Sequence, residues 1–222
     1  MPQLIKQARA YEKISQRIDY ISRALIGAPY QGRTLIGGPV RKEIFVLRDD
    51  AFDCVTYCEA VLAGAIARDY PDYAEVLKRI RYTHGEVRWA ERNHDFALWS
   101  QSNLENKICQ PGSIAPSVTL EKRLDGSGLG KRQYALPAIA TPRMIANQKA
   151  LQVGDVIGFV SRRPGLDYFH TGFIAFQNGT LMLRHASRSQ GRVMNEAMTS
   201  FVFRTGVKYV TLLRPAEPVL QS

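Results

Sequence analysis

Residues 168–186 read YFHTGFIAFQNGTLMLRHA and carry the clearest structural pattern in the chain. Two apolar runs flank Gln177-Asn178-Gly179. An Asn-Gly pair between two such runs is typical of a tight β-hairpin turn. We therefore expect two antiparallel strands, with His170 on the first arm and His185 on the second, close enough to be cross-strand neighbours if they face alike.

Outward from this hairpin, the second half of the chain predicts strands and the first half predicts helices. The expected strands are Val156–Val160, Tyr168–Phe176, Thr180–Ala186 and Lys208–Leu213. The expected helices are an amphipathic one over Leu4–Leu25 that Gly27 ends, one over Asp53–Arg68 capped by Asp53, then Tyr70–Ile80, Trp89–Leu104, and a short one at Thr141-Pro142 with Thr141 as cap. Helices followed by an antiparallel sheet predict an α+β domain.

A stretch rich in Pro, Gly and Ser lies between these halves. Residues Ile108 to Tyr134 predict a long loop or an irregular hairpin, with a strong turn signal at Asp125-Gly126-Ser127-Gly128. Loops of this length in a compact domain are often functional, for example as the wall of a groove.

The composition predicts one folded domain with an anionic partner. The 222 residues are 45% hydrophobic and carry a formal net charge of +10, which suits nucleic acid, acidic membranes and acidic cell-wall peptides alike. No run approaches the roughly 18 apolar residues that a membrane span needs. The polar first residues carry no secretory signal, which leaves the location of the natural precursor open.

Cys54 is the candidate nucleophile. Of the three cysteines, Cys54, Cys58 and Cys109, at least one must be free of intramolecular disulfides. Cys54 is expected in the first turn of its helix, where the helix dipole and unpaired backbone N–H groups favour a thiolate and can bind an oxyanion. We interpret Cys58 as a buried core residue.

The two hairpin histidines supply the partners that a thiol nucleophile needs. One ring nitrogen of His170 can take the thiol proton while His185 holds the other. Cys54, His170 and His185 therefore form a candidate nucleophile, base and orienting group.

Several ordered stretches resemble the motifs of NlpC-type, papain-like cell-wall peptidases. They are Gly27-Ala28-Pro29-Tyr30, Phe52-Asp53-Cys54, Gly154 to Phe159, His170 to Ile174, and Arg184-His185-Ala186-Ser187. Within that superfamily, further stretches resemble the N-acetylmuramoyl-L-alanine amidase-like subfamily: the Phe-Asp-Cys helix, Arg79-Ile80-Arg81-Tyr82, Arg92 to Phe96, Trp99 and Asn103. The resemblance covers residues 27 to 213 and rests on order and spacing.

The resemblance implies a papain-like fold in which Cys54 attacks, His170 is the base, His185 is the third polar residue, and Tyr30 lies near the thiol at the oxyanion site. It implies cleavage between N-acetylmuramic acid and L-alanine in peptidoglycan fragments, with no metal and no cofactor. Two features depart from the pattern. Val55-Thr56 follows the cysteine where Ser-Gly is common in the superfamily, and the single domain of residues 1–222 has an enlarged insert at about 82–142.

Substrate contacts and setting follow from the same reasoning. Arg48, Arg92 and Arg184 are candidates for pairing with stem-peptide carboxylates, and Trp99 and Tyr168 for lining the groove. We expect a monomer that acts on muropeptides in the bacterial periplasm or cell envelope, with the cytoplasm as the alternative, and that has neither a membrane span nor a nucleic-acid partner.

Four other functions stay open at this point. The first is an endopeptidase of the same fold that cuts within the stem peptide, and the second is lipid acyl transfer by a related scaffold. A zinc site of Cys54, Cys58, His170 and His185 has the right ligand types but unusual spacing. Nucleic-acid binding fits the positive charge but has no recognisable motif.

Overall fold

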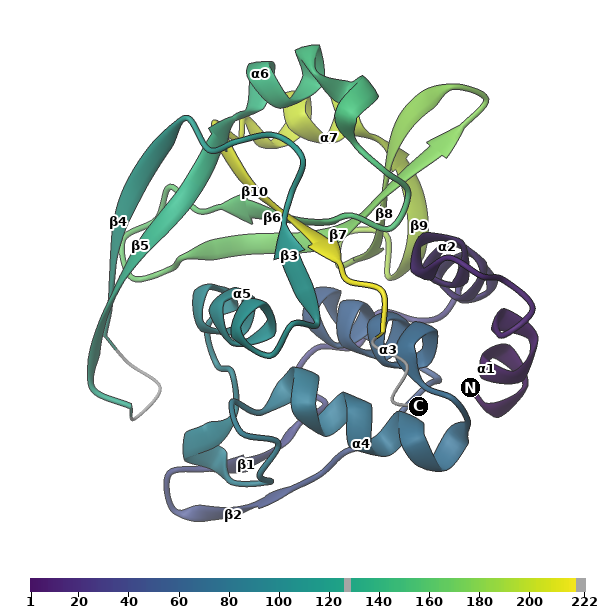
Figure 1. Ribbon diagram of the computed structural model, residues 1–222. Coiled ribbons are helices and arrows are strands. Elements are labelled where there is room, and N and C mark those ends of the chain that lie inside the picture. The colour runs from purple at the N-terminus through teal and green to yellow at the C-terminus, as the bar shows by residue number, and fades with distance from the viewer. Residues whose placement is uncertain (126–128, 219–222) are drawn as a thin grey trace.

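An antiparallel sheet forms the middle layer of the molecule, with helices on both of its faces (Figure 1). The computed structural model describes residues 1–125 and 129–218. Within them, the main sheet has eight strands in the order β4-β5-β10-β6-β7-β8-β9, and β3 pairs with β10. The prediction of an α+β domain with an antiparallel sheet is confirmed.

The elements have the following bounds. The helices are α1 Pro2–Ala8, α2 Ile14–Ala24, α3 Cys54–Ile66, α4 Tyr70–Arg81, α5 Phe96–Glu105, α6 Thr141–Ala146 and α7 Met198–Thr205, with 3₁₀ turns at Trp89–Glu91 and Gln148–Ala150. The strands are β1 Ile36–Gly38, β2 Arg41–Ile44, β3 Cys109–Pro111, β4 Val118–Asp125, β5 Lys131–Ala140, β6 Val156–Val160, β7 Tyr168–Gln177, β8 Thr180–Ser187, β9 Arg192–Ala197 and β10 Tyr209–Pro215. Strands β1 and β2 form a separate two-stranded ribbon.

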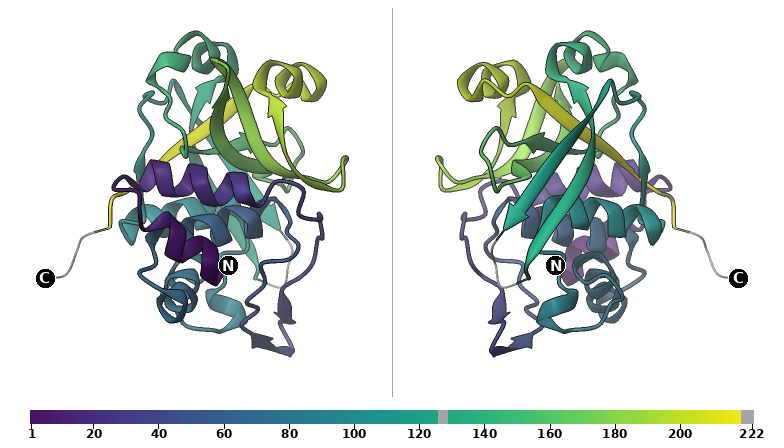
Figure 2. Two further views of the ribbon diagram at one scale, coloured as in Figure 1. Left: turned by 90° about the vertical axis from the view of Figure 1, so that its right-hand side faces the viewer. Right: turned by 90° about the vertical axis from the view of Figure 1, so that its left-hand side faces the viewer.

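Each face of the sheet has its own apolar core. Tyr57 of α3, Trp99 of α5 and Phe173 of β7 belong to the core shared with α1–α5. Phe159 of β6 and Phe201 of α7 belong to the core under α6 and α7. The side views in Figure 2 show the helical layer below the sheet and α6 and α7 above it. A residue of β7 therefore faces either α3 or α7, according to its position along the strand.

The β7–β8 hairpin forms as predicted. Gln177 pairs with Thr180, so the turn consists of Asn178 and Gly179 alone. Both have positive φ, 50° and 75°, the backbone conformation that a type I′ turn requires and that Asn-Gly adopts readily. The tight turn fixes the register of the two strands, and so the relative positions of His170 and His185.

The prediction of one helix over Leu4–Leu25 is wrong, because the chain turns between α1 and α2. The Arg17 side chain donates hydrogen bonds to the carbonyl oxygens of Tyr11 and Glu12 and so stabilises the turn. Helix α2 ends at Ala24, before Gly27, whose φ is +93°. Helical spacing of apolar residues continues across the break, which is why the sequence pattern concealed it.

Two other helix predictions need correction. Trp89–Leu104 is not one helix, because Arg92 forms a β-bridge with Tyr82 and the Asn93 N–H donates to the Arg81 carbonyl, which interrupts it before α5. Helix α6 does start at Thr141, but Ala140 is the cap residue, and the buried Thr141 hydroxyl has no hydrogen-bond partner among the described residues.

The stretch Ile108–Tyr134 contains β3, β4 and the first four residues of β5, so the hairpin interpretation is correct and the long-loop interpretation is wrong. Figure 2 shows this hairpin along the side of the molecule. The turn predicted at Asp125-Gly126-Ser127-Gly128 lies at 126–128, outside the described residues. Among the described helices, none has the length and apolar character of a membrane span.

Candidate active site

Cys54 is the first residue of α3, and Asp53 caps that helix. The Asp53 carboxylate accepts hydrogen bonds from the backbone N–H groups of Val55, at 3.1 Å, and Thr56, at 2.8 Å. The Thr56 hydroxyl in turn accepts from the Asp53 N–H, which completes a reciprocal cap. The Phe-Asp-Cys stretch thus fixes Cys54 at the helix start, where its thiol is half-buried.

Opposing effects act on the Cys54 thiol. Burial, and then the negative charge of Asp53, raise its pKa to about 12. The backbone N–H groups of Thr171, Cys54 and Val55 act in the opposite direction, because they stabilise the thiolate. The resting sulfur is therefore a neutral thiol, and it needs a base that removes its proton as it attacks.

His170 and His185 form a directly bonded pair. His170 Nε2 lies 2.6 Å from His185 Nδ1, and the rings are nearly perpendicular, at 87°. Phe173 pairs with Arg184 in the β7–β8 register, so Gly172 lies opposite His185. A Cβ on Gly172 would come within 2.9 Å of the His185 Cβ. The glycine thus leaves space in which the two imidazoles meet.

Aromatic side chains surround the histidine pair. Phe201 lies 5.5 Å from His170 and 5.8 Å from His185, and Phe159 lies 6.2 Å from His170, between ring centroids. This burial lowers the pKa of His170 to about 3 and that of His185 to about 4. Both rings are therefore neutral at neutral pH, as a general base must be.

Glu196 of β9 extends this pair to a third side chain. Its Oε2 lies 3.4 Å from His185 Nε2, a separation longer than that of a well-formed hydrogen bond. Arg204 of α7 donates from Nη2 to both Glu196 oxygens at 2.8 Å. Sequence reasoning missed Glu196 and Arg204, because residues 192–205 show no clear strand or helix pattern and their charges resemble ordinary surface charges.

Strand β7 runs past the start of α3. The N–H of Thr171, the residue after His170, approaches the Cys54 thiol closely enough to lower its pKa, and Thr171 Oγ1 lies 3.9 Å from Cys58 Sγ one turn further along α3. Within residues 1–125 and 129–218, no hydrogen bond joins Cys54 to His170. Contacts of this kind often tighten only when substrate binds.

Tyr30 lies beside the same helix start. Its N–H donates to Gly191, while the Phe52 N–H donates to Pro29 and the Phe52 carbonyl accepts from Gln31. Burial raises the pKa of the Tyr30 hydroxyl, and the nearby Cys54 and Asp53 raise it further. The sequence-predicted neighbour of the thiol is therefore a half-buried, neutral hydroxyl.

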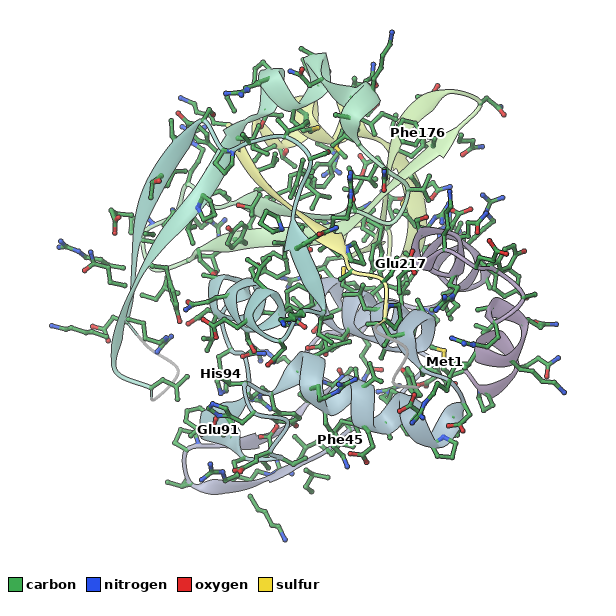
Figure 3. All side chains as sticks on the ribbon, viewed as in Figure 1. Met1, Phe45, Glu91, His94, Phe176 and Glu217 are labelled. Atoms are coloured by element: carbon green, nitrogen blue, oxygen red, sulfur yellow. The ribbon has the colours of Figure 1, made fainter. Side chains whose placement is uncertain are left out.

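A cavity of about 370 Å³ adjoins the outer side of the α3 start. Its lining includes Asp53, Val55 and Thr56 of the α3 start together with Arg92 and Trp99. Arg92 donates to the Glu43 carboxylate at 2.9 Å, and the Trp99 side chain is fully buried. His94, labelled in Figure 3 below α5, lines the same cavity.

The remaining predicted contact residues do not line this cavity. Arg48 pairs with Asp50 through two hydrogen bonds of 2.8 Å. The buried Tyr168 hydroxyl lies 2.7 Å from that of Thr211. Arg184 is only 2% exposed and donates to Asp19 and Ser22 of α2 and to Asn195 of β9, a structural role.

The four residues of the zinc alternative do not form a metal site. Cys58 is fully buried in the helical core, whereas the rings of the histidine pair lie against Phe201 of α7. Across the part of the chain that the structure describes, no three His, Cys, Asp or Glu side chains gather in a way that could hold a metal ion.

Comparison with protein families identifies residues 20–206 with the AmiA-like family, described as N-acetylmuramoyl-L-alanine amidase-like. The match covers most of the 222 residues. The chain belongs to this family. The family is one of peptidoglycan hydrolases, which agrees with the resemblance seen in the sequence motifs. Comparison with curated proteins gave no significant match.

Solved structures share the fold of this family member. A protein named N-acetylmuramoyl-L-alanine amidase from Bacteroides uniformis has a TM-score of 0.81 at 20% identity, covering 93% of this chain and 100% of the other. A Legionella pneumophila protein has a TM-score of 0.83 at 21% identity, covering 99% and 95%. A protein named as a putative xylanase from Bacteroides fragilis has a TM-score of 0.73 at 21% identity, covering 87% and 99%. At these identities the likeness concerns the fold.

Proposed function

We propose that the protein is a papain-like, NlpC-type cysteine amidase that hydrolyses the bond between N-acetylmuramic acid and L-alanine in muropeptides. The observation that carries this proposal is the placement of Cys54. It starts a capped helix beside β7, whose His170 is bonded to His185. A thiol at a helix start and a histidine held by a second polar side chain on the neighbouring strand are the components of a thiol nucleophile with an oriented base. Membership of the amidase-like family supports the choice of bond.

The first half of the reaction acylates Cys54. His170 Nδ1, the ring nitrogen not bonded to His185, takes the thiol proton as the sulfur attacks the lactyl carbonyl carbon. The backbone N–H of Cys54, which lies at the thiol, together with the Tyr30 hydroxyl, stabilises the oxyanion. The carbon–nitrogen bond then breaks, and His170 gives its proton to the leaving amine of L-alanine.

The second half releases the sugar. Water attacks the thioester carbonyl while His170 takes one of its protons, the carbon–sulfur bond breaks, and the proton returns to the Cys54 sulfur. The products are a muramic acid with a free lactyl carboxylate and a stem peptide with a free amino terminus. The two neutral histidines suit this cycle, because the base must be unprotonated before each attack.

The cavity beside Asp53 and Thr56 supports cleavage at the sugar rather than within the stem. Its volume of about 370 Å³ is within the range of small-ligand sites, and Asp53 and Val55, the sequence neighbours of Cys54, line it. We assign it to the N-acetylmuramic acid side of the bond, with Arg92 as the retained contact residue. Trp99 also lines it, whereas Arg48, Tyr168 and Arg184 are not retained as contacts because they are not among its lining residues.

The setting is proposed from the same function. A monomeric enzyme with a net charge of +10 would be drawn to acidic muropeptides in the periplasm or cell envelope. The insert at about 82–142 supplies β4 and β5 to the sheet and α5, whose Phe96 and Trp99 line the cavity.

The test is mass spectrometry of the products formed from defined muropeptides and from sugar-free stem peptides. We expect the native protein to release an intact stem peptide that begins with L-alanine, and Cys54→Ser to release none. Cys109→Ser is the matched control, because Cys109 is a buried thiol of β3 and should retain activity. A product cut inside the stem would establish the endopeptidase alternative, and absence of any Cys54-dependent product would reject both.

A further inference from the structure

We propose that Glu196 is a positioning residue that sets the protonation pattern of both active-site histidines. This inference rests on the proposed role of His170 as the base. Glu196 belongs to β9, and its carboxylate oxygen Oε2 lies 3.4 Å from the far nitrogen of His185, Nε2. The proposal concerns which of the four imidazole nitrogens carries hydrogen when both rings are neutral.

The hydrogen positions follow from what each atom can donate or accept. Arg204 donates to both oxygens of Glu196, so the carboxylate acts as an acceptor only. The nitrogen that faces it, His185 Nε2, is fully buried and forms no other hydrogen bond in the described chain. A lone pair there would point at a negative oxygen without any compensating hydrogen bond. His185 Nε2 must therefore carry the hydrogen.

The position of the hydrogen on His185 determines the position of the hydrogen on His170. A neutral imidazole with hydrogen on Nε2 has a lone pair on Nδ1. His185 Nδ1 thus accepts, and His170 Nε2, only 2.6 Å away, donates to it. His170 Nδ1 is then left without hydrogen, which is the form that can take the proton of Cys54. The opposite pattern would place hydrogen on His170 Nδ1 and remove the base.

Glu196 also acts when His170 becomes charged. The imidazolium forms in a pocket where burial, His185 and Arg204 all oppose a positive charge. Glu196 counters this, because its charge raises the pKa of His185 and stabilises positive charge shared along the bonded pair. Arg204 fixes the carboxylate by its two hydrogen bonds and lies over the Phe201 ring at 5.3 Å. The consecutive elements β9 and α7 thus supply both Glu196 and Arg204, the residues that position the histidine pair.

The first test needs no substrate. In protein labelled with ¹⁵N-histidine, the chemical shifts of the ring nitrogens distinguish protonated from unprotonated positions. We expect hydrogen on Nε2 of both His170 and His185 at pH 7. Hydrogen on Nδ1 of His170 would overturn the proposal, whatever the enzyme is found to cleave, and this result does not depend on the proposed substrate.

The second test removes only the charge of Glu196. In Glu196→Gln the side-chain amide can either accept from or donate to His185, so we expect the nitrogen shifts to become mixed. We expect kcat to fall by roughly tenfold or more, with KM within about twofold, and the acid limb of the kcat profile to move to lower pH. Glu196→Asp, which keeps the charge, should recover part of kcat.

Glu75→Gln is the matched control, because Glu75 forms an exposed ion pair with Lys78 on α4. It should leave the nitrogen shifts, kcat and the pH profile unchanged. An unchanged kcat in folded Glu196→Gln, or a loss confined to KM, would contradict the proposal. If Glu196→Gln does not fold, the ¹⁵N spectrum of the unaltered protein still decides the matter.

Discussion

Gly172 lies opposite His185 across the β7–β8 pair, and the absence of a side chain on Gly172 is what allows His185 to reach His170. A Cβ at position 172 would meet the Arg184 carbonyl oxygen at 2.8 Å and the His185 Cβ at 2.9 Å. The first neighbour is backbone, so the contact could be relieved only by moving the strands apart. The 2.6 Å bond between the two rings depends on this spacing.

We therefore expect Gly172→Ala to impair catalysis more than folding. Overpacking at this point should lower the free energy of unfolding by about 1–3 kcal/mol, and displacement of His185 should reduce kcat by roughly tenfold or more. Urea titration and product release from muropeptides measure the two effects. Gly38→Ala in the β1–β2 ribbon, where a Cβ would meet the Arg41 Cβ at an ordinary contact distance of 3.7 Å, is a control for the glycine change alone, and equal kcat values in the two variants would contradict the expectation.

Stability should fall on mild acidification because of the histidine pair. The pKa values of His170 and His185 are lowered to about 3 and about 4 in the folded protein, whereas an unfolded histidine titrates near 6.5. From about pH 6.5 down to these values, the unfolded chain binds protons that the folded chain does not. The contribution of the two histidines to the free energy of unfolding is thus fully present above pH 6.5. It decreases below pH 6.5, by up to about 1.4 kcal/mol per pH unit for each proton.

Urea unfolding at pH 7 and pH 5 tests this linkage. His185→Asn should reduce the difference in unfolding free energy between the two pH values, because one of the buried histidines is gone. His84→Gln changes a histidine whose side chain is 73% exposed and should leave the difference as it is. Identical pH dependence in all three proteins would show that the pair titrates normally.

Asp53 should hold down the reactivity of Cys54 while it stabilises α3. Its charge raises the pKa of the thiol, and its oxygen caps the helix. In Asp53→Asn the side-chain oxygen can still accept the capping hydrogen bonds, so the pKa of Cys54 should fall with little loss of stability. Iodoacetamide alkylation of Cys54, followed by mass spectrometry across pH, should begin at a lower pH than in the native protein.

Asp50→Asn is the control for that experiment, since Asp50 is an exposed partner of Arg48 and should not alter the alkylation profile. An Asp53→Asn profile that coincides with the native one would mean that the charge of Asp53 does not influence the thiol.

Tyr30→Phe tests the oxyanion role directly. If the hydroxyl stabilises the oxyanion, its loss should lower kcat by about 10²-fold and leave KM nearly unchanged, because the charge develops only during attack. Steady-state kinetics on a muropeptide measure both constants. Tyr70→Phe, which removes a hydroxyl from an exposed ring of α4, should behave like the native enzyme, and a change in KM alone for Tyr30→Phe would assign it to binding.

A buried ion pair contributes two residues to the lining of the cavity. Arg81 Nε donates to Glu59 Oε2 at 2.7 Å, and both side chains are at most 4% exposed. Arg81→Met leaves a buried carboxylate without its partner and should cost about 3–5 kcal/mol of unfolding free energy. The double variant Glu59→Gln with Arg81→Met should be more stable than Arg81→Met alone, and Arg79→Met on the exposed face is the control. Urea titration compares them.

The sequence predicted most strongly what is encoded locally. The pair Asn178-Gly179 by itself favours the tight turn between β7 and β8. Asp53 caps α3 by accepting from N–H groups two and three residues further along the chain. Both features are therefore predictable from a few neighbouring residues. Two interruptions of predicted helices could not be predicted in this way, because contacts with residues elsewhere in the chain stabilise them. The turn before α2 is stabilised by the Arg17 side chain, and the interruption before α5 by pairing of residues 92 and 93 with the end of α4.

The same distinction applies to the candidate site. Cys54, His170 and His185 stand in recognisable motifs, and the structure brings the two histidines together. Glu196 lies beside His185 because β9 pairs with β8, and the sequence of β9 alone does not predict this pairing. The prediction of Arg184 as a substrate contact failed because a distant element buries its side chain. Arg184 donates to Asp19 and Ser22 of α2, and the local sequence does not reveal where α2 packs.

The position of β10 has a consequence for the way this chain is made. Residues 209–215 pair with β3, β5 and β6 and lie in the interior of the sheet order. While the chain emerges from a ribosome, β6 has its β7 neighbour long before β10 exists, and its other edge stays unpaired. An open edge of this kind can pair with another nascent chain. Completion of the sheet, and protection from such association, must therefore await the emergence of residues 209–215.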